Sequence, residues 1–150
     1  MARVPPDEVA QGGPGRQRRG AAHPHLYAPS TLQFRGETWL HWRGVEKLWE
    51  ALYKADTDVV FSGHEHNYER FAPQDPQGRA DPEGGIRQFV VGTGGGGGEA
   101  PSSDPIANSE VRVDGTDGVL KLTLHPESYE WEFVPVEGES FTDSGGAQCH

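Results

Sequence analysis

The chain has 150 residues, the size of one domain, and its 13 basic and 23 acidic residues give a formal net charge of −10. This acidity disfavours binding to nucleic acid or to anionic membrane surfaces, and no apolar run approaches the roughly 20 residues of a membrane-spanning helix. Hydrophobic residues make up 33% of the chain, and 21 glycines and 12 prolines indicate that part of it lacks regular structure.

Residues 1–22 are rich in Pro, Gly, Gln and Arg and nearly lack large apolar side chains, which is typical of a disordered tail. Arg16, Arg18 and Arg19 would also suit a basic arm, although the acidic chain argues against a nucleic-acid partner. The tail lacks the apolar core of a signal peptide, so the sequence assigns no cellular compartment.

An amphipathic helix is predicted over residues 43–55, because apolar side chains recur there at helical spacing while charged residues occupy the other face. The apolar stripe consists of Val45, Leu48, Trp49, Leu52 and Tyr53.

Short apolar runs predict buried strands at 59–61 and 87–91, as in sheets that are covered on both faces. Residues 118–124 and 129–134 alternate in polarity and are separated by a turn-like His-Pro-Glu-Ser segment, which predicts a β-hairpin. His125 in this turn and His150 are expected to face solvent. The remaining segments are predicted as loops: 23–42, 73–85, 99–110 and 137–150.

Two histidines follow the first predicted strand directly. Gly63 allows a turn, and His64 and His66 are spaced so that their side chains point to the same side of an extended chain. The carboxyl end of a strand is where α/β sheets bind ligands, and neutral imidazole is a common ligand of zinc and iron. The pattern admits a site for one metal or two neighbouring metals, or a pair of histidines on the surface without a metal.

The segment Gly63-His64-Glu65-His66-Asn67-Tyr68-Glu69-Arg70 resembles the last metal-ligand motif of the calcineurin-like metallophosphoesterases, and most closely the purple acid phosphatase branch. The resemblance covers residues 23–150, and the order of the predicted elements agrees with it. It implies an α/β fold, a sandwich of two mixed β-sheets flanked by helices, of which this chain lacks the N-terminal half. Further supporting segments are Leu48-Trp49, Val91–Gly95, Tyr129–Phe133 and Asp143-Ser144-Gly145.

The resemblance also implies a dinuclear metal centre, with iron beside zinc, manganese or a second iron. His64 would bind one metal and His66 the other. A third ligand would be His23, with His25 as the alternative, because the order His-Pro-His departs from the His-x-Pro of the family. No catalytic residue is assigned.

Glu69 and Arg70 follow the two histidines and would either orient an imidazole through a hydrogen bond or form an ion pair that holds the loop. Tyr68 is expected to pack rather than to react. The glycine run 92–98 suggests either a phosphate-binding loop or a flexible loop after a strand, and Thr93 within it could contact substrate. The run lacks the Gly-Lys-Ser/Thr ending of a phosphate-binding loop, which favours the flexible loop.

The implied function is metal-dependent hydrolysis of phosphate esters, with a small-molecule phosphate ester as substrate. Residues 1–22 contain none of the family's upstream Asp, Asn or Tyr ligands, and imidazoles alone cannot offset the charge of two cations. We therefore expect weak metal binding and little hydrolysis from this chain by itself, and either a dimer or a separate N-terminal half as partner. The alternative is a truncated, non-catalytic fragment that binds metal or another protein. Full-length relatives are often secreted.

Overall fold

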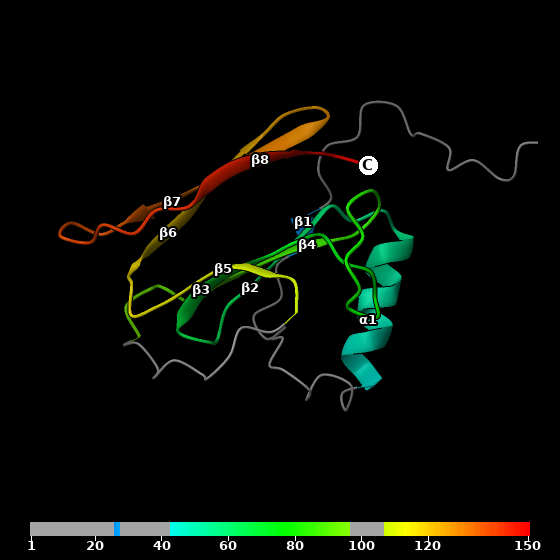
Figure 1. Cartoon of the computed structure of the whole chain (residues 1–150), viewed down its shortest axis with the longest axis horizontal. Helices are drawn as coiled ribbons and strands as arrows, with labels where there is room; N and C mark the ends of the chain where they lie inside the picture. Colours follow the sequence, from blue (N-terminus) through cyan, green and yellow to red (C-terminus); the bar gives the residue numbers. More distant parts are fainter. Residues whose placement is uncertain (1–25, 28–42, 97–106) are drawn as a thin grey trace, which may run out of the picture.

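The computed structural model describes residues 26–27, 43–96 and 107–150. Figure 1 shows two β-sheets stacked one above the other, with the helix α1 beside the larger sheet. The elements are β1 (Leu26–Tyr27), α1 (Arg43–Lys54), β2 (Val59–Ser62), β3 (Asn67–Phe71), β4 (Arg87–Val91), β5 (Ser109–Asp114), β6 (Gly118–Leu124), β7 (Ser128–Pro135) and β8 (Ser144–Gln148).

The larger sheet has five strands in the order β1-β2-β4-β3-β5. β1, β2 and β4 run parallel, while β3 is antiparallel to both β4 and β5, so this sheet is mixed as expected. The apolar sequences of β2 and β4 are explained by their burial, since Val59, Val60 and Phe89 are fully buried in the centre of the sheet.

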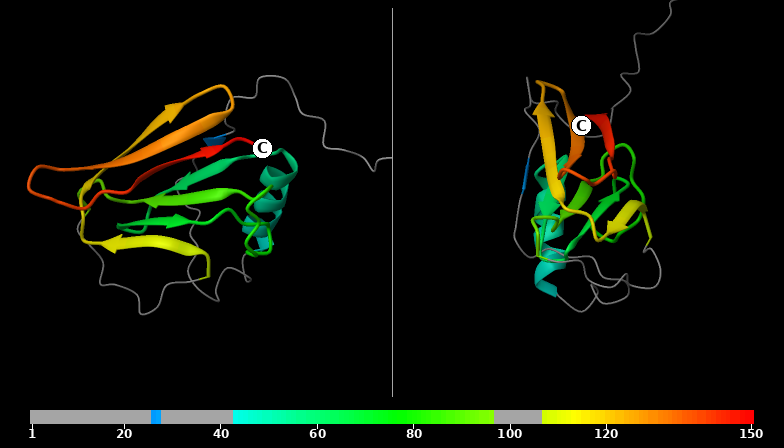
Figure 2. Two further views of the ribbon diagram at one scale, coloured as in Figure 1. Left: turned by 45° about the horizontal axis from the view of Figure 1, so that its top comes forward. Right: turned by 90° about the vertical axis from the view of Figure 1, so that its left-hand side faces the viewer.

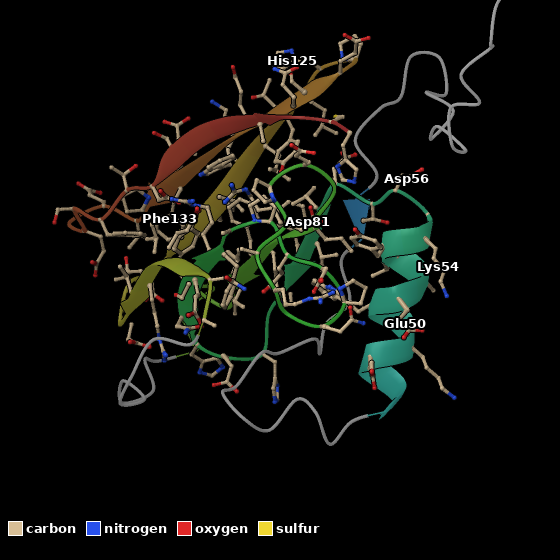
Figure 3. The ribbon with its side chains drawn as sticks, turned by 45° about the vertical axis from the view of Figure 1, so that its right-hand side comes forward. Glu50, Lys54, Asp56, Asp81, His125 and Phe133 are labelled. Atoms are coloured by element: carbon tan, nitrogen blue, oxygen red, sulfur yellow. The ribbon has the colours of Figure 1, made fainter. Side chains whose placement is uncertain are left out.

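The smaller sheet has three strands in the order β6-β7-β8. Both pairs are antiparallel, so the expectation of two mixed sheets was wrong for this one. The cause is the chain path: β6 and β7 form the predicted hairpin, in which the His125 N–H donates to the Ser128 carbonyl at 2.9 Å, and β8 turns back along β7. Figure 3 shows His125 at the exposed tip of the hairpin.

An aromatic core joins the two sheets. On β7 the buried side chains alternate with exposed glutamates, and Phe133 lies between the sheets (Figure 3). Trp131 meets Phe89 of the larger sheet edge-on, with ring centroids 5.4 Å apart. The predicted core face of the hairpin is therefore confirmed. The buried members of this core are Val59, Tyr68, Phe89, Tyr129, Trp131 and Phe133.

A second core lies on the other face of the larger sheet, beneath α1. Trp49 is 1% exposed and packs with side chains of three strands and of the segment before β4. The connector 73–85 is tied to the same helix, because the Tyr53 hydroxyl donates to Asp81 at 2.7 Å; Asp81 is labelled in Figure 3. In the described residues α1 is the single helix, and no helix is long and apolar enough to cross a membrane. The other members of this core are Val60, Phe71, Ile86 and Val90.

The C-terminal segment is more ordered than predicted. The backbone N–H of His150 donates to Asp58 Oδ1 at 3.0 Å, and its Nδ1 lies 3.1 Å from the same oxygen. His150 is exposed as a residue, as expected, but its imidazole is only 16% exposed because it lies against Asp58. The carboxylate that holds it belongs to the residue before β2, 92 positions earlier, which no local pattern reveals.

Candidate metal centre

The loop 63–66 joins β2 to β3 at one edge of the larger sheet. β2 and β4 are parallel, so Ser62 and Val91 end at this edge, and the antiparallel β3 begins there at Asn67. β5 also ends there, because Asp114 pairs with Asn67. The topology thus places both histidines at the carboxyl edge of the parallel strands, where α/β sheets bind ligands.

His64 adopts a left-handed backbone conformation, with φ of 82°. A residue with positive φ bends the chain sharply, so the expected extended geometry does not hold between His64 and His66. The side chain of His64 is exposed and that of His66 is half-buried. Both histidines sit in one four-residue loop, but the bend rather than strand alternation determines their directions.

The glycine run after β4 packs against this loop. A Cβ atom at Gly92 would overlap the carbonyl oxygen of Glu65, and a Cβ atom at Gly96 would lie 2.7 Å from Cε1 of the His66 ring. The Gly92 N–H also donates to the Asn67 carbonyl at 3.0 Å. The glycines therefore allow a close approach between two loops, a role that neither sequence interpretation included.

Thr93 joins the two sheets. It is 3% exposed, its hydroxyl donates to the Gly118 carbonyl at 2.9 Å, and its own carbonyl accepts from the Gly118 N–H at 2.9 Å. These bonds occupy the polar groups of Thr93 in a structural contact. The suggested contact with substrate stays a prediction that these bonds do not support.

Tyr68 and Arg70 point away from α1, toward the smaller sheet, and meet at one carboxylate. Asp143 accepts hydrogen bonds from the Tyr68 hydroxyl at 2.6 Å and from Arg70 Nε at 2.7 Å. The Trp131 indole N–H donates to the same oxygen at 3.2 Å. Burial, followed by the contact with Asp143, raises the pKa of Tyr68, so its phenol remains protonated. Tyr68 thus has the packing role that was predicted.

Arg70 also pairs with Glu110, which in turn accepts from Arg87 at 2.7 Å. The guanidinium carbon of Arg70 lies 5.2 Å from the centre of the Trp131 ring. These contacts agree with the ion-pair alternative for Arg70. Its possible effect on an imidazole stays a prediction.

Glu69 lies on the opposite face of β3 and is 4% exposed. Its carboxylate accepts a hydrogen bond from the Ser109 hydroxyl at 2.7 Å. Burial raises the pKa of Glu69, and the Ser109 hydrogen bond and the charge of Arg112 offset this only in part. The hydrogen bond gives Glu69 a structural contact with β5, and the proposed orientation of an imidazole is not tested by it.

Asn67 is a polar residue at this edge that sequence reasoning missed. It follows His66 directly, is 6% exposed, and its Oδ1 atom has no hydrogen-bond partner among the described residues. An amide oxygen without a partner is a possible ligand for a hard cation. Sequence analysis included Asn67 in the motif, between the histidines and Tyr68, but assigned it no role. Its position directly after His66 is the sequence feature that could have identified it.

The described residues do not bring together three metal-binding side chains of the His, Cys, Asp or Glu type. The loop offers two imidazoles, and no carboxylate joins them within the described ranges. His23 and His25 lie outside the described residues, so the third ligand stays a prediction. The described residues at this edge therefore do not make a dinuclear centre by themselves.

A pocket of about 480 Å³ lies at the opposite edge of the larger sheet. Its lining includes Asp58 and Arg87, which stand at the amino ends of β2 and β4, together with Glu110 and His150. This position separates the pocket from the histidine loop, so it is not part of the candidate metal centre.

Comparison with known proteins identified neither a matching family model nor a similar curated protein. Among solved structures, the chain is similar to the purple acid phosphatase PPD1 from seeds of yellow lupin (Lupinus luteus), with a TM-score of 0.61 and 19% identity. The match covers 81% of this chain and 24% of the lupin protein, so the chain spans about a quarter of that protein's length. At this identity the likeness concerns the fold alone. The chain therefore has part of the purple acid phosphatase fold.

Proposed function

We propose that this chain is the C-terminal part of a metal-dependent phosphoesterase of the purple acid phosphatase type. The proposal rests on the position of His64 and His66, which lie together in one loop at the carboxyl edge of the larger sheet. The chain that contains this sheet has part of the purple acid phosphatase fold. In the proposal each histidine binds one of two metal ions, iron beside zinc, manganese or a second iron. The substrate is a small phosphate ester.

The ligand set of the loop limits what this chain does alone. Two neutral imidazoles do not compensate the charge of two cations, and the described residues do not bring a carboxylate together with both histidines in a metal-binding group. We propose that the acidic ligands come from sequence that this chain does not contain, and that His23 adds a third imidazole. Hydrolysis then requires the complementary part of the enzyme.

A non-catalytic role is the second candidate, and the lack of a three-residue metal cluster among the described residues favours it. In that case the chain retains a weak metal site, or none, on a stable part of the fold. Retained metal that depends on His64 and His66 favours the first candidate, and neither candidate expects hydrolysis by this chain alone.

The first experiment measures metal stoichiometry. The purified chain is loaded with zinc, manganese or iron, freed of excess metal, and analysed by inductively coupled plasma mass spectrometry. The phosphatase proposal expects the wild-type chain to retain more metal than the His64→Ala/His66→Ala double variant, at less than the two equivalents of a complete centre. His125→Ala is the matched control, because His125 is an exposed histidine on the hairpin turn and its loss should leave the metal content unchanged.

Retention of equal metal in the double variant, or no retained metal in the wild-type chain, would count against a site in this loop. A second measurement follows p-nitrophenyl phosphate hydrolysis by the wild-type chain and the double variant. Turnover by the wild-type chain alone would contradict the expectation that acidic ligands from elsewhere are needed.

A further inference from the structure

The outer edge of β6 is open within the described part of the chain. β6 is the outermost strand of the smaller sheet, shown in yellow-orange at the top of the left view in Figure 2, and no described strand pairs with it opposite β7. The N–H and carbonyl of Gly118 both bind Thr93, on the side away from β7. Because backbone groups alternate in direction along a strand, Leu120, Leu122 and Leu124 present their N–H and carbonyl groups to this same edge.

β6 lacks three of the features that protect an edge strand from pairing, namely a proline, a bulge and a charge that points inward. Proline, a bulge, or a charged side chain pointing inward normally prevents edge-to-edge association. β6 pairs with β7 in regular register over seven residues, and its one charged residue, Lys121, is exposed on the outer face. The inward residues are leucines, and Leu124 is 46% exposed.

We propose that this edge pairs with β6 of a second copy of the chain, antiparallel and centred on Leu122. In this register Leu122 lies opposite Leu122 of the second copy, and Leu120 lies opposite Leu124. The two three-stranded sheets then form one six-stranded sheet, and the half-buried leucines of both copies form a continuous apolar row.

The charges on the outer face favour this register and this partner. Lys121 donates to Glu132 of its own chain at 3.1 Å, and Thr123 pairs with Glu130. In the proposed register Lys121 lies opposite Thr123 of the second copy, so it has its own Glu132 on one side and, one strand beyond Thr123, Glu130 of the second copy on the other. If the second strand slid by two residues, so that the pairing was centred on Lys121, Lys121 would lie opposite Lys121 of the second copy. Like charges directly opposite each other are destabilising.

The ends of the ladder are also compatible. Thr93 already occupies the place beside Gly118 on this edge, so the ladder stops short of Gly118, and Pro126 of the second copy, which would extend it there, has no N–H to donate. The pairing thus ends before Gly118, and it uses no residue of the histidine loop.

Sedimentation velocity of the full chain tests the proposal, over a roughly hundredfold range of protein concentration and in the presence of a metal chelator. The wild-type chain should show a monomer–dimer equilibrium. Thr123→Lys puts two lysines opposite each other across the interface and should weaken dimerisation about tenfold or more. Within one chain the new lysine lies beside Glu130, so the monomer should remain folded.

Two further variants complete the test. Thr123→Glu, made together with Glu130→Gln so that no two glutamates lie opposite each other within one chain, places an acid opposite Lys121 of the second copy and should strengthen the dimer. Val134→Lys adds the same charge to the outer face of β7, one strand from the edge, and should dimerise like the wild type.

A wild-type chain that stays monomeric, or a Thr123→Lys variant that dimerises as well as the wild type, would overturn the proposal. Should Thr123→Lys fail to fold by circular dichroism, association of the Thr123→Glu/Glu130→Gln variant no stronger than that of the wild type would also overturn it. Neither result affects the proposed phosphatase function, because the assay contains no metal.

Discussion

The Tyr68 hydroxyl donates a 2.6 Å hydrogen bond to the carboxylate of Asp143 and so connects the larger sheet to the smaller one. Arg70 and Trp131 donate to the same carboxylate. One acidic side chain thus collects donors from both sheets, close to the start of β3 and the histidine loop. The stability of the sandwich should depend strongly on this residue.

Replacement of Asp143 by alanine should lower the free energy of unfolding by about 3 kcal/mol, because it leaves Arg70 and two other donors without their acceptor. The Arg70 and Asp143 side chains are 13% and 10% exposed, so water replaces the lost bonds poorly. Urea unfolding followed by tryptophan fluorescence measures the change. Glu132→Ala is the control: it breaks the exposed pair with Lys121 and should cost less than about 1 kcal/mol. Equal losses in the two variants would contradict the prediction.

The same carboxylate should make stability depend on acid pH. Burial alone would raise the pKa of Asp143, but the hydrogen bonds from Arg70 and Tyr68 outweigh burial and hold it below the usual value. The stabilisation is therefore complete above the unfolded-state pKa of about 3.9 and is lost as the pH falls toward the folded-state value. Urea midpoints measured downward from pH 7 should fall more steeply below pH ~4 for the wild type than for Asp143→Asn. Parallel curves would exclude this role.

Glu69 should have the opposite effect. Its folded-state pKa is raised, mainly by burial, so the ionised carboxylate destabilises the folded chain at neutral pH. Glu69→Gln keeps an acceptor for the Ser109 hydroxyl and removes the charge. The variant should be more stable than the wild type at pH 7, and the two should converge at a pH below about 4, where Glu69 is protonated in both states. A variant less stable than the wild type at pH 7 would show that the contact with Arg112 dominates.

Gly92→Ala should disturb the histidine loop, because the new methyl group would overlap the carbonyl oxygen of Glu65. A loss of stability of about 2 kcal/mol is expected, together with lower metal retention than in the wild type if the loop binds metal. Gly94→Ala is a close control, since a Cβ atom there meets nothing within 4 Å. Its stability should stay within about 1 kcal/mol of the wild type. Equal effects of the two substitutions would mean that the contact with Glu65 does not constrain the loop.

The elements that sequence analysis predicted are those whose apolar side chains follow a simple period. The helix around Trp49, the buried strands β2 and β4, and the hairpin of β6 and β7 are all confirmed. β3 was missed because its polar side chains are buried by ion pairs and hydrogen bonds instead of facing water, as with Glu69 and Arg70. β8 was missed because Gly145 replaces a side chain: it lets the backbone lie against the Trp131 ring.

Within the candidate site, the motif and the strand before it were enough to locate His64 and His66 at the sheet edge. The direction of His64 was not predictable, because a positive φ at a non-glycine residue has no local sequence signal. The contact between His66 and Gly96 joins two loops that are 30 residues apart in the chain, and the role of Asp143 depends on a partner 75 residues from Tyr68. Such long-range contacts require knowledge of the fold.

The motif around the start of β3 combines residues with two different roles, and this matters for identifying relatives of this chain from their sequences. Tyr68 and Arg70 hold the two sheets together through Asp143, while the histidines before them carry the proposed chemistry. A relative without phosphatase activity would still need the Tyr-x-Arg pair to keep its sheets stacked. The two halves of the motif therefore carry different information: the second half concerns the contact between the sheets, and the first half the proposed metal site.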